Sequence, residues 1–222
     1  FSDPWITGDH VSLSGWAYQA SGIDPFYSYN YMVRELGIRT GFYNKKYHKF
    51  NIAMIIDYSA IDTNGKNVAI LEKYENMPLH YKYISVPLTY HYDTRDIYID
   101  PTSGALTTLS LTPSLSFGQS ENIYSFWFQY KKYFKISDGY LNPVLSFDTR
   151  VLLQKSKSFP IFAYQYLGGE DFVRGYSPIP EKNSSEVTNL IEGYNILYHS
   201  IQLQHTLFEK KEYYRMKFGL EL

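Results

Sequence analysis

One glycine-rich segment in the second half of the chain combines a permanent positive charge with aromatic side chains. Its residues are Gly168, Gly169, Glu170, Asp171, Phe172, Val173, Arg174, Gly175 and Tyr176. Glycine permits a tight turn and a close approach of the backbone. If the segment folds into an enclosed lumen, the planar guanidinium of Arg174 suits a fixed, bidentate anchor to a carboxylate. If it is an ordinary surface loop, Arg174 is simply solvated, and the segment alone leaves both interpretations open.

The residue types that carry enzyme chemistry are present but are not spaced for it. No metal-ligand spacing relates the six histidines, which are His10, His48, His80, His91, His199 and His205. No Gly-x-Ser-x-Gly, Walker or dinucleotide-binding glycine pattern occurs. Adjacent His199 and Ser200 point to opposite faces of a strand, which argues against a Ser/His pair. The absence of cysteine excludes thiolate sites and disulfides. The sequence therefore predicts no enzyme, no cofactor and no metal site.

The composition is strongly aromatic without being strongly hydrophobic. Tyrosine (24), phenylalanine (14) and tryptophan (3) make up 18% of the 222 residues, and the mean hydropathy is −0.34. A transmembrane β-barrel produces this combination, because its strands alternate lipid-facing and interior residues and carry aromatic girdles. A secreted β-sandwich has a similar composition, so periodicity must decide. The formal net charge of −1 gives no basic field for nucleic acid.

Strict alternation of apolar and polar residues favours the membrane barrel. In residues 109–117 every odd position is apolar and every even position carries a hydroxyl. Further segments long enough to cross a bilayer as tilted strands repeat the pattern: 50–59, 84–93 with Val86 among its apolar positions, 141–154, 197–207 and 214–222. Less regular strands are expected at 11–20, 29–43 and 122–135. The predicted fold class is therefore all-β, an antiparallel transmembrane β-barrel with about 8–10 strands in this chain.

The connections indicate one domain with one long loop. Short polar turns are expected at 62–66, 137–139 and 209–212. Residues 155–190 form a connection too long for a hairpin, and long barrel loops lie on the outer side or fold into the lumen. No apolar run approaches the length of a transmembrane helix. The first residues lack a signal-peptide pattern, so we expect either a removed signal or a start within a longer protein.

The glycine-rich segment resembles the signature loop of the outer-membrane protein assembly factor superfamily, the BamA/TamA type with POTRA domains. In that family Val/Ile-Arg-Gly-Phe/Tyr follows Gly-Gly on a loop that folds back into the barrel. Three other stretches agree in order: Asp3-Pro4-Trp5 before Gly8, Asp93-Thr94-Arg95-Asp96 before Pro101-Thr102-Ser103-Gly104, and Arg215-x-x-Phe218-x-x-Glu221. The resemblance covers the central part of a barrel of about sixteen strands, with no POTRA domain in residues 1–222.

The resemblance implies a specific role for the loop. The implied motif residues are Gly168, Gly169, Val173, Arg174, Gly175 and Tyr176. Arg174 would enter the lumen and pair with a carboxylate on the inner wall. Glu221 is the first candidate, at a position where the family usually has Asp, and Asp148 is the second. Glu221 could instead balance Arg215 and Lys217. The family usually offers a further Glu where this chain has Gln204.

The same resemblance implies a function without covalent catalysis. We expect a bacterial outer-membrane barrel, rather than an organellar one, that assists the insertion or translocation of other proteins. The expected partners are outer-membrane lipids, client outer-membrane or secreted proteins, other assembly-complex subunits and a second copy of the chain. Alternatives are a shortened family member acting as a passive channel, an export pore or a structural, dimeric barrel.

Overall fold

The structure of the chain is a computed structural model. Its described residues are 2–3, 11–23, 30–44, 47–62, 78–137, 142–163, 165–168, 172, 192–210 and 214–221. Apart from one short 3₁₀ helix, η1 (Ile161–Ala163), the regular elements among these residues are strands. None of the described helical residues belongs to a helix that is long and apolar enough to cross a membrane.

The strands follow one another along the chain as an antiparallel meander. Their bounds are β1 (Ser2–Asp3), β2 (Val11–Ile23), β3 (Asn30–Asn44), β4 (His48–Asp62), β5 (His80–Ser85), β6 (Leu88–Asp93), β7 (Gly104–Ser116), β8 (Ile123–Lys135), β9 (Val144–Lys155), β10 (Gln165–Tyr166), β11 (Glu192–Gly193), β12 (Ile196–Lys210) and β13 (Tyr214–Glu221).

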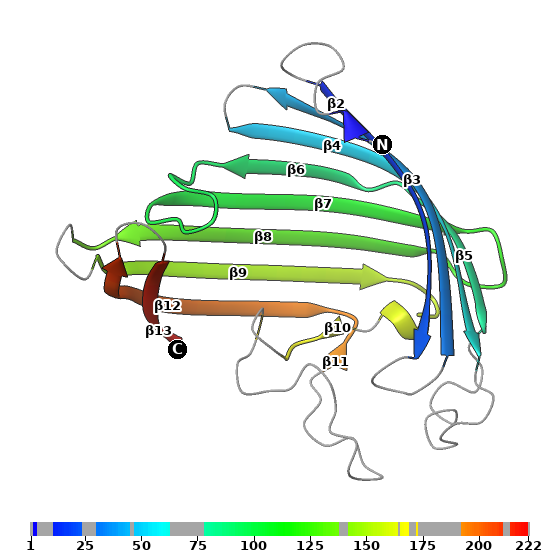
Figure 1. The fold of residues 1–222 in the computed structure, drawn as a ribbon. Helices are drawn as coiled ribbons and strands as arrows, with labels where there is room; N and C mark the ends of the chain where they lie inside the picture. The colour runs from blue at the N-terminus through cyan, green and yellow to red at the C-terminus, as the bar shows by residue number, and fades with distance from the viewer. Residues whose placement is uncertain are drawn as a thin grey trace, which may run out of the picture.

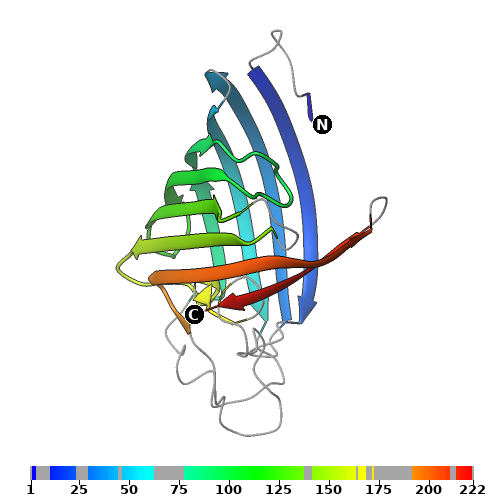
Figure 2. The same ribbon diagram turned by 90° about the vertical axis from the view of Figure 1, so that its left-hand side faces the viewer.

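Eleven of these strands form a single sheet. Its order is β1-β2-β3-β4-β5-β7-β8-β9-β12-β13, and β6 follows β5 end to end, so that both lie between β4 and β7. The sheet bends strongly from β2 on one side to β12 on the other (Figures 1 and 2). The two remaining strands, β10 and β11, pair with each other. The prediction of an all-β, antiparallel fold is confirmed, and strands coincide with the predicted segments.

One predicted strand is interrupted, which corrects the expectation of an unbroken strand at 84–93. It divides into β5 and β6 at Val86 and Pro87. Proline has no N–H to donate to a strand ladder. The carbonyl of Pro87 still accepts a bond of 3.0 Å from Ala53 N–H, and Val86 N–H donates to Pro113 O at 3.0 Å. The two pieces therefore keep the alternation of the predicted strand.

The two faces of the sheet have opposite chemistry. Apolar side chains are exposed on one face, including Met54 (49% exposed) and Leu111 (54%). The other face contains buried polar side chains such as Ser146 (3%) and Asp148 (4%), and we call it the inner face. This distribution inverts that of a soluble protein and matches strands that face hydrocarbon outside and a polar interior inside. The alternation read from the sequence therefore assigns the faces correctly.

Aromatic rings gather on the outer face where β3, β4 and β6 lie side by side. Phe42 stacks on Phe50 with ring centroids 5.2 Å apart, and Phe50 lies 4.9 Å from Tyr90. The next row brings His48 to 4.8 Å from Tyr92. Aromatic and amphipathic rings of this kind mark the boundary between hydrocarbon and water in membrane barrels.

On the inner face of β2 and β3, the side chain of Trp16 lies over Gly37. Trp16 pairs in register with Gly37, and its ring occupies the space above Gly37. A Cβ at that position would lie 2.1 Å from the Trp16 Cζ2 atom. The Trp16 indole N–H donates to Glu35, and the Arg39 guanidinium lies 5.2 Å from the ring centroid. Glycine is therefore needed at 37 because the ring approaches the backbone so closely.

We expect Gly37→Ala to destabilise the folded protein by about 1–3 kcal/mol, because the added methyl group displaces the Trp16 ring from both contacts. The measurement is the free energy of unfolding in urea, with the protein refolded into lipid vesicles. Gly15→Ala is the matched control on the neighbouring strand, because the nearest atom to its Cβ is 3.7 Å away. Equal losses in the two variants would contradict the packing explanation.

Candidate functional site

Asp148 lies on the inner face of β9, where two cations surround it. Its Oδ2 atom accepts hydrogen bonds from Arg150 Nη2 at 2.8 Å and Arg150 Nε at 3.1 Å. Lys131 Nζ on the neighbouring strand β8 is 3.6 Å from the same oxygen. The side chain of Asp148 is only 5% exposed. A buried carboxylate needs compensating charge of this kind, since desolvation of an unpaired one is costly.

Arg150 also links this carboxylate to the long loop. Its guanidinium carbon lies 5.0 Å from the ring centroid of Phe172 and 5.3 Å from that of Tyr198 on β12. The two rings meet edge to face at 5.5 Å. The Tyr198 hydroxyl donates a hydrogen bond of 3.2 Å to the Phe172 carbonyl oxygen. Phe172 is therefore held on the inner wall by its ring and by its backbone.

Apolar packing extends the same contact. Leu152, Ile196 and Tyr198 form a buried cluster on β9 and β12. Leu167 and Phe172 pack against it from the loop, and Trp127 packs from β8. We call Asp148, Arg150, Tyr198 and Phe172 the loop clamp. These contacts hold Phe172, the residue before Val173 in the chain, on the inner wall.

The first part of the loop also packs on the inner face. The Phe162 ring, in η1, meets Tyr81 and Tyr83 of β5 edge to face, at centroid distances of 4.9 Å and 6.4 Å. Phe159 stacks on Tyr194 at 4.0 Å. Tyr81 and Tyr83 are 1% and 2% exposed, so these contacts exclude water from this part of the wall. In Figure 1, η1 lies beside the end of β9 near β5.

A second ordered segment connects β6 to β7 at the opposite end of the strands. The Asp96 carboxylate accepts bonds from Thr102 N–H at 2.9 Å, from the Thr102 hydroxyl at 2.6 Å and from Ser103 N–H at 3.2 Å. Arg95 forms a bidentate pair with Asp93, with bonds of 2.9 Å and 2.6 Å. These bonds close the connection into one fixed shape.

Gly104 ends this connection in a conformation that favours glycine. Its φ is +95°, and an added Cβ would lie 2.2 Å from the Thr94 carbonyl oxygen. The neighbouring backbone is bonded on both sides, because Thr94 N–H donates to Ala105 O at 2.8 Å and Ala105 N–H donates to the Thr94 hydroxyl at 3.0 Å. The positive φ and the close Thr94 carbonyl oxygen therefore explain why glycine ends the Pro-Thr-x-Gly stretch that the sequence analysis singled out.

Comparison with known proteins identifies the family. Residues 1–221 match the Omp85 superfamily domain. The chain belongs to the Omp85 superfamily. This confirms the resemblance drawn from the motif loop, and it confirms the outer membrane as the location of this β-barrel protein. No curated protein sequence matches the chain.

A solved structure with a similar fold is BamA from Haemophilus ducreyi lacking POTRA domains 1–3. The TM-score is 0.70 at 14% sequence identity, over 95% of this chain and 45% of that chain. At this identity the likeness establishes the fold alone. The Omp85 chain described here spans less than half the length of that BamA chain.

The sequence-predicted site residues are only partly covered by the structure. Gly168 is described, whereas Gly169, Val173, Arg174, Gly175 and Tyr176 lie outside the described residues, as do Pro4, Trp5 and Gly8. The pairing of Arg174 with Glu221 or Asp148 therefore stays a prediction, as does the placement of the whole loop 155–190 in the lumen of this Omp85 barrel. The part of the loop that is described supports that placement, since it packs on the inner face.

The backbone register bears on the two candidate partners. Glu221 pairs with Gln202, and Gln202 pairs with Ser146. Glu221 therefore stands in the row next to the one that contains Asp148. Because Arg150 and Lys131 already compensate Asp148, we propose Glu221 as the partner of Arg174.

The sequence reasoning missed the central member of the loop clamp. Alternation in residues 141–154 places Arg150 on the inner face, but it does not show that Arg150 contacts the loop. One signal was available, because Asp148 and Arg150 are two residues apart and so share a face of the strand. The partners Phe172 and Tyr198 are 26 residues apart in sequence, and no local pattern joins them. Among the described residues, no group of three His, Asp or Glu side chains is arranged to hold a metal ion.

The β6–β7 connection gives a pH prediction. The Asp96 carboxylate is mostly exposed, and the slight desolvation that it undergoes opposes ionisation. The bonds donated by the Thr102 hydroxyl and by the amides of Ser103, Thr102 and Ile97 outweigh this effect and lower the pKa of Asp96 to about 2. The unfolded value is about 3.9. Since the folded pKa is the lower one, the ionised carboxylate stabilises the fold above about pH 4, and this contribution is lost as the pH falls toward 2.

We therefore expect Asp96→Asn to lower the Tm by a constant amount above about pH 5, and the difference from the wild type to vanish near pH 2. The effect is below about 1 kcal/mol, because the carboxylate is exposed and screened by solvent. Thermal unfolding of both proteins at several pH values measures it. A difference that does not change with pH would show that the charge of Asp96 plays no part.

Proposed function

We propose that this protein assists the insertion of other β-barrel proteins into the outer membrane. Its membership of the Omp85 superfamily supports this role. The structural observation that carries it is the loop clamp, which holds the described residues before the Val-Arg-Gly-Tyr motif on the inner wall. A loop anchored in this way suits a lumen occupied by protein rather than a passive aqueous channel.

The physical problem is the cost of unpaired backbone in hydrocarbon. A client strand that enters the bilayer alone exposes N–H and C=O groups with no water to bind them. An assembly barrel lowers this barrier by offering strand edges on which a client can pair first. Pairing and release of strands require no covalent step, so the role is that of a template and not of an enzyme. Its partners are client barrels, outer-membrane lipids and other subunits of an assembly complex.

Depletion of the protein in its host tests the proposal. We expect the amounts of other folded β-barrels in the outer-membrane fraction to fall while lipoproteins of the same membrane stay constant. Re-expression of the wild-type gene should restore them. Unchanged levels of all other barrels after full depletion would reject the assembly role.

A further inference from the structure

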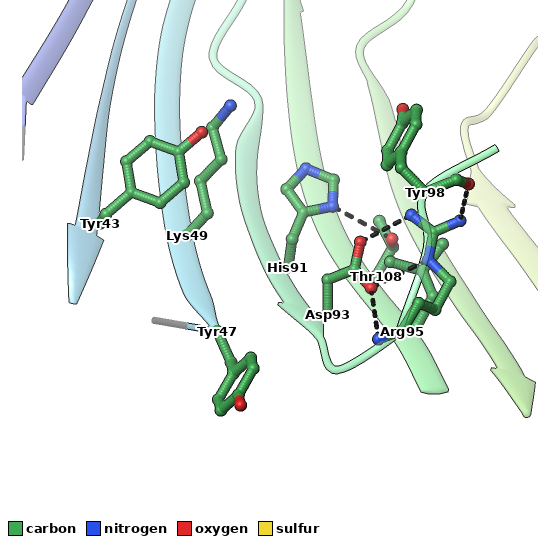
Figure 3. Close-up of a pocket in the computed structure, with 9 residues that line it drawn as sticks. Tyr43, Tyr47, Lys49, His91, Asp93, Arg95, Tyr98 and Thr108 are labelled. Carbon is green, nitrogen blue, oxygen red and sulfur yellow. Dashed lines mark hydrogen bonds and ion pairs between the residues drawn. The ribbon is translucent and has the colours of Figure 1, made fainter. Parts of the chain in front are cut away.

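A cavity of about 570 Å³, lined by charged, hydroxyl-bearing and aromatic side chains, opens between the neighbouring ends of β3 and β4 and the β6–β7 connection. It is separate from the loop clamp. Tyr43, Tyr47, Lys49 and His91 line one part of it, and Arg95 and Tyr98 line another. Figure 3 shows these side chains, with Arg95 between Asp93 and Tyr98.

The cavity belongs to the inner face of the barrel. Lys49 pairs across the strands with His91, and His91 pairs with Thr108. The same row continues through Gln129 to Arg150 of the loop clamp. Directly paired residues point to the same face of a sheet, so Lys49 and His91 share the face of Arg150. An acyl chain on the hydrocarbon side cannot reach this face.

The balance of charge in the cavity is positive. The carboxylate of Asp93 is engaged by Arg95 at 2.6 Å. Lys49 lies over the Tyr43 ring, with its Nζ atom 5.1 Å from the centroid, and no described carboxylate pairs with it. His91 is bonded to the Thr108 hydroxyl at 3.1 Å and stands directly beside Lys49. An anionic group placed between Lys49 and His91 would gain a charge-assisted hydrogen bond.

One wall of the cavity is aromatic and lies on the β6–β7 connection. Tyr98, which lines the cavity, is 78% exposed, and the next residue, Ile99, is 91% exposed. Tyr98 lies on the connection that Asp96 and Gly104 hold in one shape, so ordering this loop costs little on binding. Aromatic rings beside a cationic centre suit a carboxylate whose neighbours are flat and apolar.

We propose that this cavity recognises an acidic side chain, flanked by aromatic residues, on an extended client polypeptide at the mouth of the barrel. The inference rests on the proposed assembly function and names the chemistry of the client segment that it would receive. Lys49 supplies the charge, His91 and Thr108 supply polar contacts, and Tyr43 and Tyr98 supply the aromatic walls. Arg95 serves to fix the rim through Asp93.

Two fluorescein-labelled peptides test the proposal: an extended peptide with a central Tyr-Glu-Tyr, and the same peptide with Tyr-Gln-Tyr. Fluorescence anisotropy with the full chain folded in detergent micelles measures binding. We expect the glutamate peptide to bind more tightly, and Lys49→Gln to weaken it by about tenfold, the loss of one charge-assisted bond. The glutamine peptide should be unaffected by the substitution.

Lys82→Gln is the matched control. Like Lys49, Lys82 holds its Nζ atom over a tyrosine ring, at 5.9 Å from the Tyr58 centroid, but it is on β5 and away from the cavity. Its substitution should leave peptide binding unchanged, and circular dichroism should show that both variants are folded. Equal binding of the two peptides, equal losses in the two variants, or displacement by anionic lipid micelles instead of peptide would overturn the inference.

The outcome is separable from that of the proposed function. If depletion impairs other barrels but the glutamate peptide shows no preference, the assembly role stands and the cavity assignment fails. If depletion has no effect, the assembly role fails whatever the peptides show.

Discussion

Replacement of Asp148 by asparagine is expected to destabilise the folded barrel by about 3–5 kcal/mol, because it removes the buried carboxylate that Arg150 and Lys131 share. The two cations now lie 2.8 Å and 3.6 Å from Asp148 Oδ2. The measurement is the free energy of unfolding in urea in lipid vesicles, followed by tryptophan fluorescence. The loop should also become more sensitive to protease, since Arg150 loses the group that orients it under Phe172.

A double variant distinguishes a lost charge pair from a general packing defect. Asp148→Asn with Arg150→Met removes one of the cations together with the carboxylate, and it should recover about 1–3 kcal/mol relative to the sum of the single variants. Glu121→Gln is the control, because Glu121 is exposed and a surface substitution changes stability by less than about 0.5 kcal/mol. Strict additivity of the two clamp substitutions would contradict the pairing.

Reversal of the charge of Arg174 should abolish most of the proposed assembly activity. If Arg174 pairs with Glu221, then Arg174→Glu and Glu221→Arg each place two like charges together and weaken loop docking by about 2–5 kcal/mol. Client barrels would then accumulate in a protease-sensitive, unfolded form. The combined exchange Arg174→Glu with Glu221→Arg restores opposite charges, so it should recover part of the activity.

The same set of variants tests the choice between the two carboxylates. Arg174→Glu combined with Asp148→Asn should gain nothing, because Arg150 and Lys131 already compensate Asp148. Recovery in this variant, and none in the exchange with Glu221, would transfer the role to Asp148. Full activity of both single charge reversals would remove the ion pair from the mechanism.

The faces of the sheet could be predicted because they depend on a local rule. Successive side chains of a strand point to opposite sides, so the alternation in residues 109–117 and 141–154 determines which residues meet hydrocarbon and which meet the interior. That rule placed Asp148 on the inner face, where it is found at 4% exposure. The motif segment was singled out by its resemblance to the family's signature loop, because glycine and arginine in this arrangement also fit an ordinary surface loop.

Alternation could not predict which inner-face residues meet. It defines a face, but the row in which a residue lies depends on the register between strands, and the register depends on turns and on neighbours distant in sequence. The contact of Lys49 with His91 follows from pairing of β4 with β6, and that of Arg150 with Tyr198 from pairing of β9 with β12. Alternation also could not predict the break at Val86 and Pro87. The pattern shows only which residues are apolar, and it does not show whether the backbone at such a position can join the strand ladder.

The sequence by itself therefore determined the class of fold and the two faces of the sheet, because both are set by residues close together in the chain. Only the tertiary structure decided that the Trp16 ring lies over Gly37, that Phe172 docks on Arg150, and that a positively charged cavity forms beside Lys49. These contacts depend on the registers in which the strands pair and on where the loop returns to the sheet. The contributions of these contacts to stability depend on burial that arises only when several segments pack together.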